Sequence, residues 1–347
     1  MKTVTKIFAV LLTFSYLSSL TAALAQDAPS SGGGRRGGGR AGATEETWWV
    51  NKPAGGESAY KAPMRPLWRL ADLKQMHASQ NNWSQIIIRD NEQDVTYNSG
   101  APGTRITPRV HPDTPTAFVI IAGQIRFNVE SQAATVAKRG SIVHILKTAS
   151  YSTEVIGNEN ALWIEVNILG YTTLYPTTGV KPDAVPGAPV VKVAFSRSPV
   201  PYTGSNTLHF NTLDAIANCT VGPAVADDHM YINPLLGFVN PADNKCGGGG
   251  GNIGSGPAKP GDPPFNTKVP FGHMHSGAVE WWIVQVGAIS GKFENFGEFH
   301  AVEGDVLYAA PMTWHQMAAE APSGPSVRLA IGAYQRISMQ NTGPAEP

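Results

Sequence analysis

Short runs of β-branched and aromatic residues, separated by glycine and proline, recur in both halves of the chain. Examples are AFVIIAGQIRF at 117–127, ALWIEVNI at 161–168 and VEWWIVQVGAISGKF at 279–293. Runs of this composition are typical of β-strands joined by tight turns. A helical period is visible only weakly, around Leu67–Met76, so the pattern predicts an all-β protein.

The strand-like runs form an internal repeat marked by glycines. In the first half Gly140 follows Gly123 at the same interval at which Gly304 follows Gly287 in the second half. The offset between the two copies is therefore constant, and similar apolar runs surround each pair of glycines. The repeat predicts two similar β-domains in tandem, which we place at residues 61–180 and 181–347.

The amino-acid composition agrees with an all-β fold, and the net charge argues against a nucleic acid as binding partner. The 347 residues include 37 glycines and 27 prolines, and 42% of the residues are hydrophobic, which suits a turn-rich protein with a sizeable core. The formal net charge is zero, so no basic surplus exists to bind a phosphate backbone. A small molecule is therefore the expected partner, not a nucleic acid, and a homo-oligomer is left open.

The segment at 1–25 has the pattern of a secretory signal peptide. Lys2 and Lys6 precede an apolar run, and small residues at 23 and 25, in Ala23-Leu24-Ala25, form a cleavage site before Gln26. A Gly/Arg-rich linker follows at 26–60, and no later segment reaches the roughly 18 to 20 apolar residues of a membrane span. The sequence thus predicts a periplasmic or secreted protein with no membrane span after signal cleavage.

The strongest chemical signal is GHMHSGAVE at 272–280. His273 and His275 are two positions apart, so on a strand both imidazoles point to one side. Glu280 has the wrong parity for the same unbroken strand, and a turn or bulge at Ser276-Gly277 would bring its carboxylate back. With His315 as a fourth candidate, this set of nitrogen and oxygen ligands suits a transition metal.

These residues resemble the metal motifs of the cupin superfamily. HMHSGAVE at 273–280, followed by Gly287, is similar to the first cupin motif, and residues 304–315 are similar to the second. Pro311 lies one position later than usual, and Ala319 replaces the common asparagine. The resemblance implies two tandem cupin (jelly-roll-type) β-barrels, with metal ligands His273, His275, Glu280 and His315.

The first half has lost most of these ligands. The constant offset between the copies places Arg109, His111, Thr116 and Tyr151 at the four ligand positions. Only the histidine survives, and an arginine would repel a cation. His144 is a further candidate ligand, although a packed strand histidine is the simpler interpretation. The first domain is therefore expected to be a degenerate cupin, and the second to bind one metal ion.

Three other features stay open at the level of sequence. Trp282 shares strand parity with Glu280, and Met317 shares it with His315, so each could line the metal pocket or simply pack in the barrel core. Residues 227–229, Asp-Asp-His, could bind a second ion, but an acidic loop is the simpler interpretation. The Gly/Pro-rich stretch at 246–264 predicts a long loop before the last strands.

The resemblance implies an oxidoreductase of the dioxygenase type that acts on a small oxygen-rich or aromatic substrate. One divalent transition metal per chain is expected, with Fe(II) or Mn(II) favoured over Cu, Ni or Zn, and Glu280 as the catalytic base. The alternatives are a non-catalytic exported cupin that binds a small molecule or carbohydrate with a structural metal, and an oxalate-degrading or germin-like enzyme. Oxalate decarboxylases are expected to keep both metal sites, which the first half does not.

Cys219 and Cys246 are the only cysteines, and in an oxidising compartment we expect them to pair. The disulfide would close the long loop between the two cysteines and stabilise the protein by about 3 kcal/mol. Thiol titration of the denatured, unreduced protein is expected to find no free thiol. Two free thiols per chain would dismiss the disulfide.

Overall fold

The computed structural model describes residues 60–203, 206–217, 225–226, 230–237, 272–276, 279–320, 326–332 and 337–341. The predicted signal peptide, nearly all of the linker, Cys219, Cys246, residues 227–229 and the stretch at 246–264 lie outside the described residues. No helix in the described part of the chain is long and apolar enough to cross a membrane.

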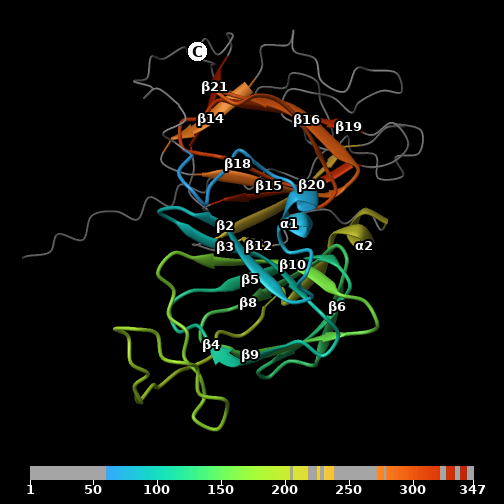
Figure 1. The fold of residues 1–347 in the computed structure, drawn as a ribbon. Coiled ribbons are helices and arrows are strands. Elements are labelled where there is room, and N and C mark those ends of the chain that lie inside the picture. The colour runs from blue at the N-terminus through green and yellow to red at the C-terminus, as the bar shows by residue number, and fades with distance from the viewer. Residues whose placement is uncertain are drawn as a thin grey trace, which may run out of the picture. The chain divides into compact units, whose positions relative to one another are not determined.

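The first half folds into a sandwich of two antiparallel sheets (Figure 1). Its six-stranded sheet, in the order β11-β8-β5-β10-β3-β2, consists of β2 (Trp83–Arg89), β3 (Gln93–Gly100), β5 (Thr116–Ala122), β8 (Ser141–Ile145), β10 (Ala161–Ile168) and β11 (His209–Asn211). Its four-stranded sheet, in the order β4-β9-β6-β7, consists of β4 (Arg105–Val110), β6 (Gln124–Val129), β7 (Thr135–Lys138) and β9 (Ser150–Ile156).

The second half repeats this arrangement, and its strands from β14 onward are drawn in orange and red in Figure 1. Its six-stranded sheet, in the order β1-β18-β15-β20-β13-β12, consists of β1 (Leu67–Trp68), β12 (Val225–Ala226), β13 (Tyr231–Gly237), β15 (Glu280–Val286), β18 (Val306–Ala309) and β20 (Ser326–Gly332). Its five-stranded sheet, in the order β17-β16-β19-β14-β21, consists of β14 (Gly272–Ser276), β16 (Ala288–Phe293), β17 (Gly297–Val302), β19 (His315–Glu320) and β21 (Ile337–Asn341). The predicted all-β fold with two similar β-sandwiches is confirmed.

Among the described residues two short helices accompany the strands: α1 (Leu70–Met76), where the weak helical period lies, and α2 (Thr212–Ala217). Asp305 holds the start of α1, because its carboxylate accepts a hydrogen bond from the Leu70 backbone N–H at 2.9 Å. β1 and α1 thus contact the second sandwich, and β11, which follows residue 180, pairs with β8 of the first. The domain boundary at residue 180 stays a prediction.

The repeat is visible in the backbone as well as in the sequence. Gly123 and Gly287 have φ values of 69° and 72°, and Gly140 and Gly304 have φ values of 85° and 88°. These positive values lie in the left-handed region that a residue without a Cβ adopts at little cost. The matching turns explain why the glycines keep the same spacing in both halves.

Three apolar clusters lie within the described part of the chain. One lies inside the first sandwich and includes Phe118 and Trp163, and another lies inside the second and includes Trp282 and Val284. The third, which we call the shared core, combines residues from the two six-stranded sheets, among them Ile164 and Trp281. Both sandwiches belong to the same compact unit of the chain.

The shared core explains a difference between strand sequences. β5, β10 and β15 are almost entirely buried along their length, whereas β6 alternates between exposed and buried positions. A strand that is covered on both faces reads as a continuous apolar run, and one with a solvent face alternates. The runs AFVII and WWIV therefore mark the two sheets that contribute to the shared core.

Polar contacts also join the two halves. The Trp281 indole N–H donates to Gln93 Oε1 at 2.6 Å, and the Tyr308 hydroxyl donates to Asp90 at 3.1 Å. Arg139 and Glu303, which occupy equivalent positions in the repeat, form two hydrogen bonds of 2.7 Å at the surface. The first of these contacts is buried, so it carries the larger share of the energy.

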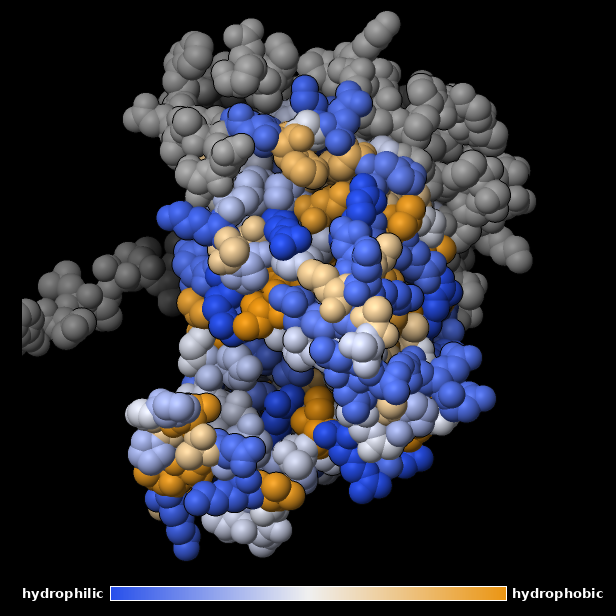
Figure 2. Space-filling model, viewed as in Figure 1, coloured by the Kyte–Doolittle hydropathy of each residue, from blue (hydrophilic) through white to orange (hydrophobic). Residues whose placement is uncertain are grey.

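The segment between β10 and β11 exposes apolar side chains. Five of them lie within residues 180–195, namely Val180, Val185, Val191, Val193 and Phe195. In Figure 2 orange patches lie on the lower-left lobe, where Figure 1 draws this segment in yellow-green. Nothing in the structure shows what covers these residues, and the homo-oligomer stays open.

Gln93→Leu is expected to lower the free energy of unfolding by about 1–3 kcal/mol, because it leaves the buried Trp281 N–H without its acceptor. Leucine fills a similar volume, so little packing is lost. Urea unfolding followed by tryptophan fluorescence measures the change. Arg139→Ala is the control, since it breaks a surface pair worth at most about 1 kcal/mol; equal effects of both variants would contradict the role of the Gln93 contact.

Candidate metal centre

Three strands of the second sandwich bring the four predicted ligands together. β14 carries His273 and His275, β15 begins with Glu280 and β19 begins with His315. In the register of the sheet His273 lies opposite His315. One donor atom from each of the four side chains lies within 4.8 Å of every other, and this is the group in the described residues that could hold a metal ion.

The sheet arrangement solves the parity problem of Glu280. β14 belongs to the five-stranded sheet, and β15 belongs to the six-stranded sheet of the same sandwich. The chain therefore changes sheet between Ser276 and Glu280, so strand alternation does not run through the motif. The ligands of each sheet point into the space between the two sheets. Met274 lies between the two histidines on β14 and therefore points to the other face of that strand, where it is also buried.

Short distances show how closely the donors converge. Glu280 Oε2 lies 2.6 Å from His275 Nε2, 3.4 Å from His315 Nε2 and 3.8 Å from His273 Nε2. The Nε2 atoms of His273 and His315 lie 3.2 Å apart. One carboxylate oxygen and three ring nitrogens thus face a common point.

The protonation of His315 follows from its surroundings. Its Nδ1 lies 2.9 Å from the carbonyl oxygen of Thr313, and a carbonyl can only accept, so Nδ1 carries the proton. Burial lowers the pKa of His315 to about 4, and the ring is neutral at neutral pH. Its Nε2 therefore presents a lone pair toward His273 Nε2, which is the arrangement of a metal ligand held by a backbone carbonyl. The donor set fits a transition-metal ion.

The centre is walled on one side and reachable on another. His275, Glu280 and His315 are buried, whereas the His273 side chain is 20% exposed. The rings of Trp282 and Phe293 lie 5.1 and 6.1 Å from the His315 ring, centroid to centroid. Water or a small molecule would therefore approach past His273.

Trp282 and Met317, which the sequence left between lining the metal pocket and packing in the barrel core, differ in their contacts. Trp282 both contacts His315 and belongs to the apolar cluster of the second sandwich, so both interpretations hold for it. Met317 lies in that cluster.

Sequence reasoning missed Arg328. It pairs with Val284 in the sheet register, and Val284 and Ala330 are on the face that packs inside the second sandwich. Burial lowers the pKa of Arg328 to about 10, against the effect of the Glu280 charge, so the side chain stays protonated at neutral pH. The sequence offered one signal for this position. In the strand-like run SVRLAIG, Arg328 is two residues from Ala330 and therefore points to the same face of the strand.

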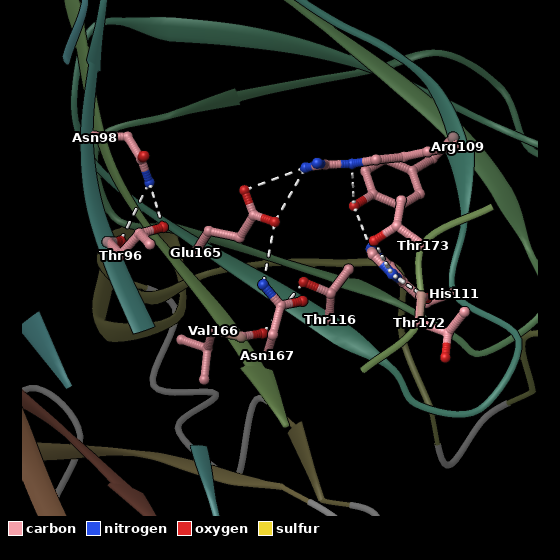
Figure 3. Close-up of polar contacts among 11 residues, drawn as sticks. Thr96, Asn98, Arg109, His111, Thr116, Glu165, Val166, Asn167, Thr172 and Thr173 are labelled. Carbon is pink, nitrogen blue, oxygen red and sulfur yellow. Dashed lines mark hydrogen bonds and ion pairs between the residues drawn. The ribbon is translucent and has the colours of Figure 1, made fainter. Parts of the chain in front are cut away.

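The equivalent place in the first sandwich holds an arginine. Arg109 pairs with Tyr151 in the register, as His273 pairs with His315. Figure 3 shows Arg109 reaching Glu165, with distances of 3.0 and 3.2 Å to the two carboxylate oxygens. The Arg109 Nε–H donates to the Tyr151 hydroxyl at 2.9 Å, and that hydroxyl lies 2.9 Å from His111 Nε2.

The charges in this cluster balance. Burial on its own would lower the pKa of Arg109, but the Glu165 carboxylate and Tyr151 outweigh it and raise that pKa. Burial lowers the pKa of His111, so its ring is neutral. His144 is buried in β8 and does not belong to a metal-binding group among the described residues.

No protein-family model matches the sequence, and no curated protein matches it. Among solved structures, a salicylate 1,2-dioxygenase from Pseudaminobacter salicylatoxidans superposes with a TM-score of 0.50 at 11% identity, covering 80% of this chain and 88% of that chain. The same enzyme as an adduct with gentisate gives a TM-score of 0.50 at 9% identity, covering 79% and 84%.

An oxalate decarboxylase from B. subtilis covers 81% of each chain at 12% identity, with a TM-score of 0.41, which is too low to indicate a shared fold by itself. The similarity to the dioxygenase structures extends over both sandwiches. The chain thus has the fold expected from its sequence, two tandem cupin-type β-barrels.

Proposed function

We propose that the protein is a metal-dependent oxidoreductase of the dioxygenase type, which acts on a small oxygen-rich or aromatic substrate. The observation that carries the proposal is the convergence of His273, His275, Glu280 and His315 on one point, beside a partly exposed His273. These four side chains would hold one divalent transition metal. Export to the periplasm or outside the cell, from the N-terminal sequence, is part of the proposal.

Three nitrogens and one carboxylate oxygen suit Fe(II) or Mn(II), with Cu, Ni and Zn as alternatives. When bound, such a metal polarises an oxygen-bearing substrate and supports redox chemistry. Four protein donors leave room in a six-coordinate shell for one or two further ligands. The ligand set therefore allows catalysis as well as structural binding.

The side chains of this chain supply the rest of the chemistry. Glu280 Oε2 faces the three imidazoles, and a carboxylate oxygen in this place can accept a proton from a substrate hydroxyl. Trp282 and Phe293 pack against His315 and exclude water from that side. The charge of Arg328, buried in the same sandwich, favours an anionic form of the substrate.

The fold supports the dioxygenase class, since salicylate 1,2-dioxygenase has this fold and a solved adduct with gentisate. The alternatives are a non-catalytic exported protein that binds a small molecule or carbohydrate beside a structural metal, and an oxalate-degrading or germin-like enzyme. Consumption of dioxygen with phenolic acids, compared with oxalate and with a no-substrate control, separates these functions.

We expect one metal ion per chain, held in the second sandwich. His275→Ala removes a buried ligand and is expected to empty the site, whereas His111→Ala alters only the equivalent place in the first sandwich. Elemental analysis of both purified variants and of the wild type measures the difference. Loss of metal in His111→Ala alone would overturn the assignment.

Glu280→Gln is expected to keep most of the metal, because three imidazoles remain, yet to lose two to three orders of magnitude in rate. That loss corresponds to roughly 3–4 kcal/mol of barrier, and its cause is that an amide cannot accept the substrate proton. Metal content and turnover are measured on the same sample. A fully metallated variant of unchanged activity would make Glu280 a replaceable ligand only.

A further inference from the structure

The inside of the first sandwich carries polar side chains where a packed core would carry apolar ones. On β10, Trp163, Glu165 and Asn167 share one face, and the alternating residues of that strand contribute to the shared core. On the neighbouring β3, Thr96 lies opposite Glu165 and Asn98 lies opposite Trp163. One wall of the interior is therefore polar over two adjacent strands.

The other wall supplies Arg109, His111 and Tyr151. Arg109 lies on β4 and Tyr151 on β9, and Figure 3 shows the Arg109 and Glu165 side chains pointing toward one another. The Arg109 and Glu165 side chains are 16% and 11% exposed, so solvent reaches this otherwise buried cluster. The Tyr171 ring packs edge-on against the His111 ring at 5.2 Å and adds an aromatic surface.

Two polar atoms on the β10 wall have hydrogen-bonding capacity that the described residues do not use. Asn167 is 3% exposed; its Nδ2 donates to Glu165 Oε1 at 3.2 Å, while its Oδ1 accepts no hydrogen bond from them. The indole N–H of Trp163 is also buried without an acceptor among them. Buried polar atoms without partners are uncommon and costly, so the wall is suited to a ligand that both donates and accepts.

Two side chains of this wall, Glu165 and Asn167, have no polar counterpart in the second sandwich. In the sheet register Asn167 lies opposite Thr116 and Glu165 lies opposite Phe118. At the corresponding places of the second sandwich Gly332 lies opposite Glu280 and Ala330 lies opposite Trp282. The fold itself does not require a carboxylate and an amide at these two places, since the other copy has alanine and glycine there and carries its buried Arg328 at the place of Trp163.

Charge and hydrogen bonding together select the kind of ligand. The formal charges of Arg109 and Glu165 cancel, so a bare anion would lose its hydration without a net countercharge. An anion without a hydroxyl group also has no proton for Asn167 Oδ1. A hydroxyl group can donate to that oxygen and can accept from an N–H, and aromatic side chains beside the cluster suit the face of a ring.

We propose that the first sandwich is a second, metal-independent binding site for a small uncharged ring compound that bears several hydroxyl groups, such as a cyclitol or a monosaccharide. The site is separate from the proposed metal centre. It does not depend on the dioxygenase proposal, and each can fail without the other.

The test uses the full chain and the probes myo-inositol and D-glucose, with saturation-transfer NMR and titration calorimetry as readouts. Wild type and the metal-site variant His275→Ala are both expected to bind at least one probe with similar affinity. Asn167→Leu keeps the side-chain volume and is expected to weaken binding at least tenfold. Asn128→Leu, at an exposed position of β6 in the same sandwich, is the matched control and is expected to bind as wild type does.

Circular dichroism checks that each variant is folded. If Asn167→Leu does not fold, Trp163→Phe replaces it, because this substitution removes the indole N–H and keeps an aromatic ring of smaller size. Binding of neither probe by the wild type would overturn the proposal. So would binding that survives Asn167→Leu or Trp163→Phe unchanged, binding that His275→Ala abolishes, or binding of benzoate in preference to both neutral probes.

Discussion

The packing of the two six-stranded sheets against each other in the shared core constrains every strand within them. β10 and β15 are buried on both faces, because one face contributes to the shared core and the other faces the interior of its own sandwich. Side chains alternate along a strand, so successive residues serve different purposes. Val166 and Trp281 stabilise the contact between the halves, while their neighbours Glu165 and Glu280 point into the two interiors.

This alternation places the four candidate metal ligands and the Arg109–Glu165 cluster on opposite sides of the two packed sheets. A strand that is fixed on its shared-core face cannot slide, because a shift by one position would turn its apolar residues inward to the polar cluster. The Gln93–Trp281 hydrogen bond strengthens this registration next to Glu280. The geometry of the candidate metal centre thus depends on the first sandwich, although that sandwich contributes none of the four clustered side chains.

The two sandwiches have similar backbones but carry different side chains at the ligand positions. In the second sandwich a carboxylate and three imidazoles converge and suit a cation from solution. In the first, the guanidinium of Arg109 is a cation that the chain carries itself, and its carboxylate partner comes from β10 instead of β5. Tyr151 stands in register where His315 stands in the other copy, and it bridges Arg109 and His111. The same scaffold therefore supports one charge-balanced interior and one that suits a metal ion.

The sequence by itself determined the fold class, the repeat and the four side chains that cluster, because β-propensity, turn glycines and ligand spacing are local properties. It also showed that Arg109, Thr116 and Tyr151 replace ligands in the first half, since a constant offset between the two copies suffices for that comparison. The partners of these residues were not determined in this way. Glu165 and Arg328 lie on strands that pair with β5 and β15 from far along the chain, and no spacing within a motif reports such a pairing. The change of sheet between Ser276 and Glu280, the shared core and the polar wall around Asn167 were decided only in the tertiary structure, where long-range strand pairing determines which faces are buried together.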